Sequence, residues 1–229
     1  MELITVTVGP FGTNCHILHR DGAATVVDPG HGAAAEVRRV VAAHGLTVDR
    51  VLLTHGHIDH IRDAGEVARD HDVPVLLHRE DHAWLTGPGR PVPLMCEGPL
   101  GEMFGVADMV PLTVDDVTGY GETVDIAGET YTVHHMPGHS PGSVMLHRPG
   151  ATGEGEPGAG TVIGGDVLFR GGVGRTDLPL SSPEAMARTL RRLPGLFGEH
   201  DVVLPGHGPS TTVGHETRTN PFLRQPGGL

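Results

Sequence analysis

Four short segments of the sequence carry side chains that could bind metal ions. They are residues 54–60 (THGHIDH), 137–139 (PGH), 164–166 (GGD) and 205–207 (PGH). Together they offer five imidazoles and two carboxylates, a mixed nitrogen and oxygen donor set that Zn²⁺, Fe or Mn accepts. The candidate metal ligands are His55, His57, Asp59, His60, His139, Asp166 and His207. Because no segment could build such a site alone, the fold must bring these ligands together.

Each of these segments follows a short apolar run that is rich in β-branched residues. The runs are 51–53, 131–133, 161–163 and 202–204, and each is typical of a buried strand. A glycine then breaks the strand, which lets the chain turn sharply and approach a bound ion closely. If the strand ends share one edge, a rigid sheet would aim their ligands at one place.

The spacing of the first segment favours metal binding over a solvated turn. A lone His-x-His is commonly a solvated turn, but here Asp59 and His60 follow directly. Without a metal, so many neighbouring polar groups would have to be satisfied internally. His134 and His135 are left out of the site, since alternation along a strand points only one of them inward.

The remaining patterns predict where strands and helices lie. Further strands are expected at 3–8, 15–19, 25–28, 73–77, 122–126, 130–135 and 143–147, and helices at 33–44, 63–70 and 183–193. Two series of strands and strand-helix units predict an α/β (α+β) fold, an αββα sandwich of two packed mixed β-sheets with helices on the outer faces. A single domain is expected over 1–220, with a C-terminal tail at 221–229.

Composition narrows the class of protein. The net charge is −12, which argues against nucleic acid as a partner because phosphate binding needs a basic stripe. No apolar run approaches the ~20 residues of a membrane span and no export signal is recognised, so a cytoplasmic location without membrane association is expected. The chain has no lysine, which excludes lysine-based catalysis, and Cys15 and Cys96 are expected to be reduced thiols.

The ligand pattern resembles that of the metallo-β-lactamase-fold hydrolases over nearly the whole chain. The motif His-x-His-x-Asp-His at 55–60 is followed by a histidine, an aspartate and a histidine in the expected order. The resemblance implies two divalent metal ions, with Zn²⁺ favoured over Fe or Mn. It implies three sets of ligands: His55, His57 and His139 for the first ion, Asp59, His60 and His207 for the second, and Asp166 as the bridge between them.

Finer motifs are similar to those of the glyoxalase II-type thioester hydrolases. The stretches are 13–15 (TNC), 137–143 (PGHSPGS), 165–169 (GDVLF), 174–177 (GRTD), 205–208 (PGHG) and 216–222 (ETRTNPF). The resemblance implies that a metal-bound hydroxide, oriented by Asp59, cleaves S-lactoylglutathione or a related low-molecular-weight thiol ester. Larger glyoxalase II enzymes continue into a helical domain that binds glutathione, whereas here only 22 residues follow His207.

Two further features bear on the site. The segment 86–118 is interpreted either as a substrate wall or lid, or as a packed connection over the core. Arg175 and Asp177 are expected to form an ion pair or to support a metal ligand.

Several alternatives stay open at this stage. A persulfide dioxygenase would share the fold and hold one Fe(II) with two histidines and one aspartate, and a non-catalytic metal-binding module would bind metal without turnover. Two other classes are disfavoured, because a common type of β-lactamase would carry cysteine in place of Asp166 and an oxygen-reducing diiron protein would carry glutamate in place of His57. The sequence leaves open the acyl group, the thiol carrier, the metal and the oligomeric state.

Overall fold

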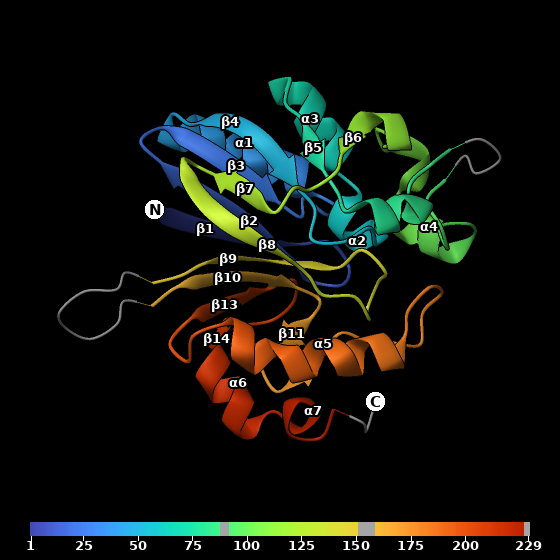
Figure 1. Cartoon of the computed structure of the whole chain (residues 1–229). Helices are drawn as coiled ribbons and strands as arrows, with labels where there is room; N and C mark the ends of the chain where they lie inside the picture. The colour runs from blue at the N-terminus through green and yellow to red at the C-terminus, as the bar shows by residue number, and fades with distance from the viewer. Residues whose placement is uncertain (88–91, 151–158, 227–229) are drawn as a thin grey trace. The chain divides into compact units, whose positions relative to one another are not determined.

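The computed structural model describes residues 1–87, 92–150 and 159–226 (Figure 1). Contacts along the chain divide it into two compact units. Unit 1 comprises Met1–Gly121 and Asp125–Glu129, and unit 2 comprises Glu122–Val124 and Thr130–Leu229. The described strands form two six-stranded sheets and one two-stranded hairpin, with one large sheet belonging mainly to each unit.

The sheet of unit 1 changes from antiparallel to parallel along its width. Its order is β1-β2-β3-β4-β5-β6, with β1–β3 antiparallel and β3–β6 parallel. Parallel neighbours need a crossover, and helices α1 and α3 supply the first two. The bounds are β1 (Glu2–Val8), β2 (Thr13–Arg20), β3 (Ala23–Val27), α1 (Ala33–His44), β4 (Thr47–Leu52), α3 (Ala64–His71), β5 (Val75–Leu76) and β6 (Val117–Thr118).

Helix α1 packs on this sheet through one apolar stripe. Ala33, Val37 and Val40 are spaced by one helical turn and are buried in the same cluster as Val26 and Val51 of the sheet. The helix ends at Gly45, whose left-handed conformation lets its N–H donate to the carbonyl of Val41. The core of unit 1 thus fixes the strand ends from which the first ligand segment leaves.

The connection from β5 to β6 holds short helices packed on unit 1. They are η1 (Arg79–Trp84), α4 (Pro99–Met103), η2 (Val106–Asp108) and η3 (Val114–Asp116). Buried Arg62 anchors this connection, since its guanidinium donates to the carbonyls of Phe104 (3.0 Å) and Gly105 (2.9 Å). Much of the segment 86–118 is therefore a packed connection over the core of unit 1. Its residues 88–91 lie outside the described part of the chain.

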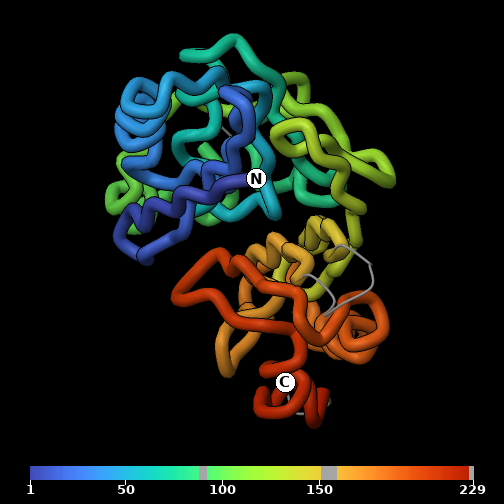
Figure 2. Tube along the Cα trace, turned by 90° about the vertical axis from the view of Figure 1, so that its left-hand side faces the viewer, coloured from blue at the N-terminus to red at the C-terminus, as the bar shows by residue number. Residues whose placement is uncertain are grey.

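The sheet of unit 2 repeats the combination of antiparallel and parallel pairing. Its order is β14-β13-β10-β9-β8-β7, and β10 and β13 are parallel neighbours joined through helix α5. Figure 2 traces the end of the chain, in red, through β13, β14, α6 and α7. The bounds are β7 (Thr123–Ile126), β8 (Glu129–His135), β9 (Val144–Arg148), β10 (Thr161–Gly165), β11 (Leu168–Phe169), β12 (Gly172–Val173), α5 (Pro183–Leu196), β13 (Val202–Pro205), β14 (Thr211–Thr212), α6 (Val213–Thr219) and α7 (Pro221–Arg224).

The predicted elements agree closely with these bounds. The run at 161–163 lies at the start of β10, and the helix predicted at 33–44 coincides with α1. Residues 221–224 form helix α7 at the start of the expected tail, and 227–229 lie outside the described residues. The division into a domain over 1–220 and a tail stays a prediction. In the described ranges, no helix is both long and apolar enough to cross a membrane.

Asp63 forms hydrogen bonds between the start of α1 and the segment that follows the candidate ligands at 55–60. Its Oδ2 accepts hydrogen bonds from the N–H groups of Gly32 (2.9 Å) and Ala34 (3.0 Å) at the start of α1. Its Oδ1 accepts from the guanidinium of Arg62 at 2.7 Å. The N-cap residue of helix α1 is Gly32, which has no side chain that could accept a hydrogen bond. Asp63 therefore supplies the acceptor from a distant part of the sequence.

We expect Asp63→Ala to lower the free energy of unfolding by about 3 kcal/mol, because Arg62 would stay buried without its carboxylate and two N–H groups would lose their acceptor. Urea denaturation followed by circular dichroism measures this change. Asp63→Asn keeps one oxygen and should cost less. A midpoint for Asp63→Ala equal to that of the wild type would contradict this role.

Candidate metal centre

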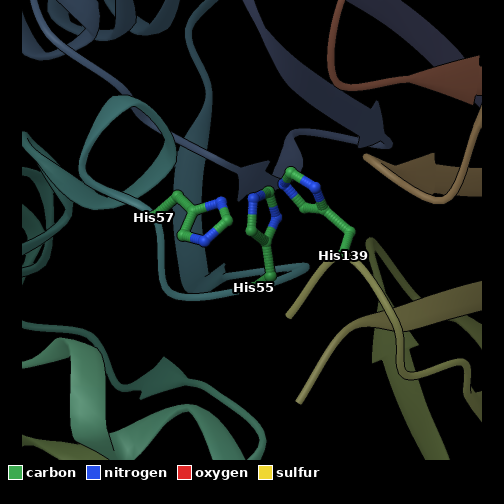
Figure 3. Close-up of side chains that lie close together, drawn as sticks. All are labelled: His55, His57 and His139. Atoms are coloured by element: carbon green, nitrogen blue, oxygen red, sulfur yellow. The ribbon is translucent and has the colours of Figure 1, made fainter. Parts of the chain in front are cut away.

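The turn after β4 carries the four candidate ligands of unit 1. His55 and His57 lie on the turn itself, and Asp59 and His60 lie in the short helix α2 (Ile58–Ile61) that begins directly after His57. All four are buried. Figure 3 shows the imidazoles of His55 and His57 next to each other; their ring centroids are 4.7 Å apart and the rings meet edge to face.

Asp28 supports this turn from behind, and it is only 1% exposed. It follows β3 and has a positive φ of 50°, a conformation that Asp tolerates better than most residues. Its Oδ1 accepts from the backbone N–H of Thr54 (2.8 Å), and its Oδ2 accepts from the Thr54 hydroxyl (2.6 Å) and lies 3.0 Å from Nδ1 of His60. Asp28, His55 and His60 offer ligand atoms that lie within 4.8 Å of one another.

These hydrogen bonds determine which ring nitrogen of each histidine carries the proton. A carboxylate only accepts, so the Nδ1 of His60 must donate to Asp28. The Thr54 hydroxyl has one proton, which it gives to Asp28, so it can only accept from the Nδ1 of His55 at 3.1 Å. In both rings the proton is then on Nδ1, and the lone pair on Nε2 is available for a metal ion.

Asp59 lies beside His60 at a separation that suits two ligands of one ion. Its Oδ2 is 3.4 Å from the Nε2 of His60 and accepts from the hydroxyl of Thr13 at 3.1 Å. Two atoms that each lie about 2.1 Å from a metal in tetrahedral geometry are about 3.4 Å apart. The backbone of Asp59 packs closely on Gly30. A Cβ on Gly30 would overlap the carbonyl oxygen of Asp59.

Unit 2 brings together the other three candidate ligands. His139 lies on the loop between β8 and β9 (labelled in Figure 3), Asp166 follows β10 and His207 follows β13. The Oδ2 of Asp166 is 3.5 Å from the Nε2 of His139 and also 3.5 Å from the Nε2 of His207. Both distances exceed those of ordinary hydrogen bonds and match the ligand separation given above. One carboxylate is therefore shared between two imidazoles.

A backbone carbonyl orients the imidazole of His139. Its Nδ1 lies 2.8 Å from the carbonyl oxygen of Arg175, which can only accept, so Nε2 again carries the lone pair. Gly174 and Gly138 permit this arrangement. A Cβ on Gly174 would lie 2.8 Å from the His139 ring, and a Cβ on Gly138, whose φ is +150°, would lie 2.5 Å from the Cα of Met186.

The expected ion pair between Arg175 and Asp177 is confirmed. The guanidinium donates two hydrogen bonds to the carboxylate, from Nε (2.6 Å) and Nη2 (2.7 Å). Hydrogen bonding from Arg175 lowers the pKa of Asp177 to about 2. Both side chains are largely exposed, so it is the Arg175 carbonyl, and not this pair, that contacts His139.

Sequence reasoning missed the supporting residues of the turn. Asp28, Thr54 and Thr13 each contact a candidate ligand or its partner, yet none was selected as a site residue. A signal for Asp28 was present, because it follows the apolar run at 25–27 at a turn that contains Pro29 and Gly30, much as the ligand segments follow apolar runs. The two threonines lie in the quoted stretches 54–60 and 13–15, but those stretches do not reveal the hydrogen bonds of their hydroxyls, whose partners are distant in sequence.

Both cysteines are free and buried, and neither is suited to act as a nucleophile. Burial, followed by the nearby charges of Asp28 and Asp63, raises the pKa of the Cys15 thiol far above its usual range. Burial and then the charge of Asp59 raise the pKa of Cys96 to about 12. A thiol must ionise to attack, so both side chains stay unreactive near neutral pH.

Comparisons with known proteins identify the family of this chain. The model of the metallo-beta-lactamase superfamily matches residues 8–207. The chain is 35% identical over 223 residues to the probable metallo-hydrolase YqgX of Bacillus subtilis, covering 97% of this chain and 98% of that protein. It is 30% identical over 225 residues to hydroxyacylglutathione hydrolase GloC of Haemophilus influenzae, covering 97% of each. The chain belongs to the metallo-beta-lactamase superfamily.

Two solved structures share the fold at appreciable sequence identity. The B3 metallo-beta-lactamase BLEG-1 has a TM-score of 0.78 and is 30% identical, covering 97% of this chain and 99% of that one. TTHA1623, solved in a di-iron-bound form, has a TM-score of 0.73 and is 34% identical, covering 96% and 99%. The predicted fold class is thereby confirmed, with two mixed sheets and helices, and the chain is classed as a metallohydrolase.

We expect Asp28→Asn to weaken metal binding by about 10- to 100-fold. An amide cannot accept from the Thr54 hydroxyl, His60 and the Thr54 N–H together, so the proton of His60 moves to Nε2 or a hydrogen bond is lost. Competition with a chromophoric zinc chelator measures the affinity, and ¹⁵N NMR of the imidazoles reports the tautomer.

Asp21→Asn is a matched control for this change. Asp21 also has a positive φ, of 51°, but its side chain is exposed in the turn between β2 and β3. The control should bind metal like the wild type. Unchanged affinity and unchanged tautomers in Asp28→Asn would show that Asp28 does not orient His60.

Proposed function

We propose that the seven candidate ligands together hold two divalent metal ions and that the protein hydrolyses small S-acyl thioesters in the manner of glyoxalase II. The observation that carries the proposal is the Asp166 carboxylate, which lies at equal distance from His139 and His207. A carboxylate oxygen between two imidazoles is the arrangement that a ligand bridging two ions requires. Membership of the metallo-beta-lactamase superfamily supports the same assignment.

We divide the proposed ligands between the ions as the resemblance to metallo-β-lactamase-fold hydrolases implies. His55, His57 and His139 would hold one ion, Asp59, His60 and His207 the other, and Asp166 would bridge them. We favour Zn²⁺ for both sites because nitrogen and carboxylate donors suit it. Iron is the main alternative, since a relative of known structure was solved in a di-iron-bound form. The donor set also accepts manganese.

The reaction requires a nucleophile, and neither a cysteine nor a lysine of this chain is suited to that role. Both thiols are buried and protonated at neutral pH, and there is no lysine, so water is the nucleophile we propose. Two bound divalent ions would lower the pKa of such a water from ~15.7 toward ~7 and polarise the thioester carbonyl.

The residues around Asp59 would orient this water. The Thr13 hydroxyl and Gly30 hold Asp59 from the side of β2 and of the segment after β3. A carboxylate fixed in this way can accept a hydrogen bond from water and keep its position through the reaction. Asp59 is therefore the residue to which we assign a catalytic role besides metal binding.

The name of one relative supports a thioester as the substrate class. The protein GloC, named a hydroxyacylglutathione hydrolase, aligns with 97% of this chain. The alignment spans 97% of GloC as well, so the resemblance does not depend on an additional glutathione-binding domain. A second candidate is β-lactam hydrolysis, because BLEG-1 is equally identical to this chain.

The purified protein should hydrolyse S-D-lactoylglutathione and contain about two metal ions per chain, quantified on the same sample. We expect His57→Ala and Asp166→Asn to lower kcat/KM at least about 100-fold, since each removes a metal ligand. His200→Ala, which removes an exposed histidine outside the ligand set, is the matched control and should keep full activity.

Three other results would contradict the proposal, each in favour of a different function. Turnover of nitrocefin without turnover of any thioester would favour a β-lactamase. A single iron with oxygen uptake on glutathione persulfide would favour a persulfide dioxygenase. Tight metal binding without turnover of any of these compounds would favour a non-catalytic metal-binding module.

A further inference from the structure

We infer that Glu216 and Asn220, which lie at the C-terminal end of the chain, position the three metal ligands of unit 2 by holding the β11–β12 hairpin. The inference rests on the ligand assignment of the proposed function. Both residues belong to α6 or its last cap, well after His207 in sequence, and neither is a ligand candidate. Both side chains are fully buried, with 0% exposure.

Glu216 is a buried carboxylate whose hydrogen-bond donors come from two separate segments. Its Oε1 accepts from the hydroxyl of Thr211 at 2.6 Å. Its Oε2 accepts from the N–H of Gly171, at the tip of the hairpin, at 2.8 Å and from the Asn220 side chain at 2.9 Å. A charge is retained in such a place only when donors replace water, and these three donors do so.

Asn220 connects the same carboxylate to the hairpin backbone. Its amide donates to Glu216 and to the carbonyls of Gly172 (3.1 Å) and Phe169 (3.5 Å). Its Oδ1 accepts from the N–H of Phe222 at 3.0 Å and so caps the start of α7. The pair therefore binds both an N–H and two carbonyl groups of the hairpin turn.

The hairpin and the residues directly before and after it include or contact every candidate ligand of unit 2. Asp166 lies two residues before its first strand, at Leu168. The ring of Phe169 packs edge to face on the imidazole of His207, with centroids 6.0 Å apart. Two residues after its second strand, the carbonyl of Arg175 holds the Nδ1 of His139. A displacement of the hairpin would therefore disturb all three ligands together.

The hairpin cannot hold this position through its own pairing. Each of its strands has two residues, paired only as Leu168 with Val173 and Phe169 with Gly172. Isolated two-stranded hairpins are marginal in water even when they are longer. Its position must come from contacts outside it, and the Glu216–Asn220 pair supplies hydrogen bonds at its turn. These two residues are thus positioning residues, not catalytic ones.

The decisive variant is Asn220→Asp, which adds a second carboxylate beside Glu216 and removes the donors to Gly172 and Phe169. It keeps the oxygen that caps α7, so the helix itself should be retained. We expect the affinity for Zn²⁺ to fall about 10- to 100-fold, by chelator competition. In the Co²⁺-loaded protein, the visible absorption spectrum should shift because the ligand geometry changes.

Two changes at Glu216 separate hydrogen bonding from charge. Glu216→Gln can still accept from Gly171 and Asn220 through its oxygen, while its amide donates to the Thr211 hydroxyl. We expect it to bind metal within about 3-fold of the wild type. Glu216→Ala loses all three hydrogen bonds and should behave like Asn220→Asp.

The matched control is Glu199→Gln, which changes an exposed acidic side chain that pairs with Arg218 of α6. It should leave metal affinity unchanged. If Asn220→Asp does not fold, as judged by circular dichroism, Asn220→Ala takes its place and should also weaken metal binding. Thermal unfolding of the metal-free proteins separates a local effect, in which the variant's midpoint stays near that of the wild type, from a general loss of stability.

The outcomes distinguish this inference from the proposed function. If the wild type binds no divalent ions, the proposed function fails. If the wild type binds two ions and both Asn220 variants and Glu216→Ala bind them equally well with the same Co²⁺ spectrum, only the positioning role is overturned. The positioning role would also be overturned if the metal-free variants lose as much stability as accounts for their whole fall in metal affinity.

Discussion

The arrangement depends on one requirement of imidazole chemistry, which is that a histidine binds a metal only through a nitrogen without a proton. Each ligand ring therefore needs an acceptor behind it that takes the proton of the other nitrogen. Asp28 and the Thr54 hydroxyl do this for His60 and His55, and the Arg175 carbonyl does it for His139. The fold must therefore place these hydrogen-bond acceptors as accurately as it places the metal ligands.

The parallel pairing of β3 with β4 meets this requirement in unit 1. Val27 pairs with Leu52 at the end of both strands, and the N–H of Asp28 donates to the carbonyl of Leu52. The residues that leave the two strands are then neighbours, so Asp28 reaches both polar groups of Thr54. Parallel strands place their carboxyl ends at the same edge of the sheet, and the pairing of β3 with β4 along their length fixes that edge.

Buried negative charge gives a physical reason for metal ions here. Asp28, Asp59 and Asp166 are all at most 8% exposed, and a buried carboxylate is costly unless donors or cations compensate it. Asp28 has three donors from the chain itself. The Nε2 atom of His60 lies 3.4 Å from Asp59, and those of His139 and His207 lie 3.5 Å from Asp166. These separations are longer than an ordinary hydrogen bond and suit two ligands of one ion.

The sequence predicted the ligand-bearing elements well and the supporting contacts poorly, and the reason is physical. Strands such as β10 and β13 are apolar runs that end in glycine or proline, so local pattern alone reveals them. The hairpin β11–β12 has two residues per strand and leaves no periodic signal. Thr13 and Thr54 act through hydroxyl groups whose partners are distant in sequence, and Arg175 acts through its backbone carbonyl, so residue type alone does not reveal these roles.

The difference between the paired strands and the short β11–β12 hairpin explains why the residues after His207 affect the geometry of the site. The paired strands β10 and β13 fix the points at which Asp166 and His207 leave the sheet. The hairpin that follows Asp166 has only two residues in each strand and buries Leu168 in the core of unit 2, so hydrogen bonds from residues distant in sequence add to its support. The segment after His207 therefore contributes to the geometry of the site although none of its residues is a candidate ligand.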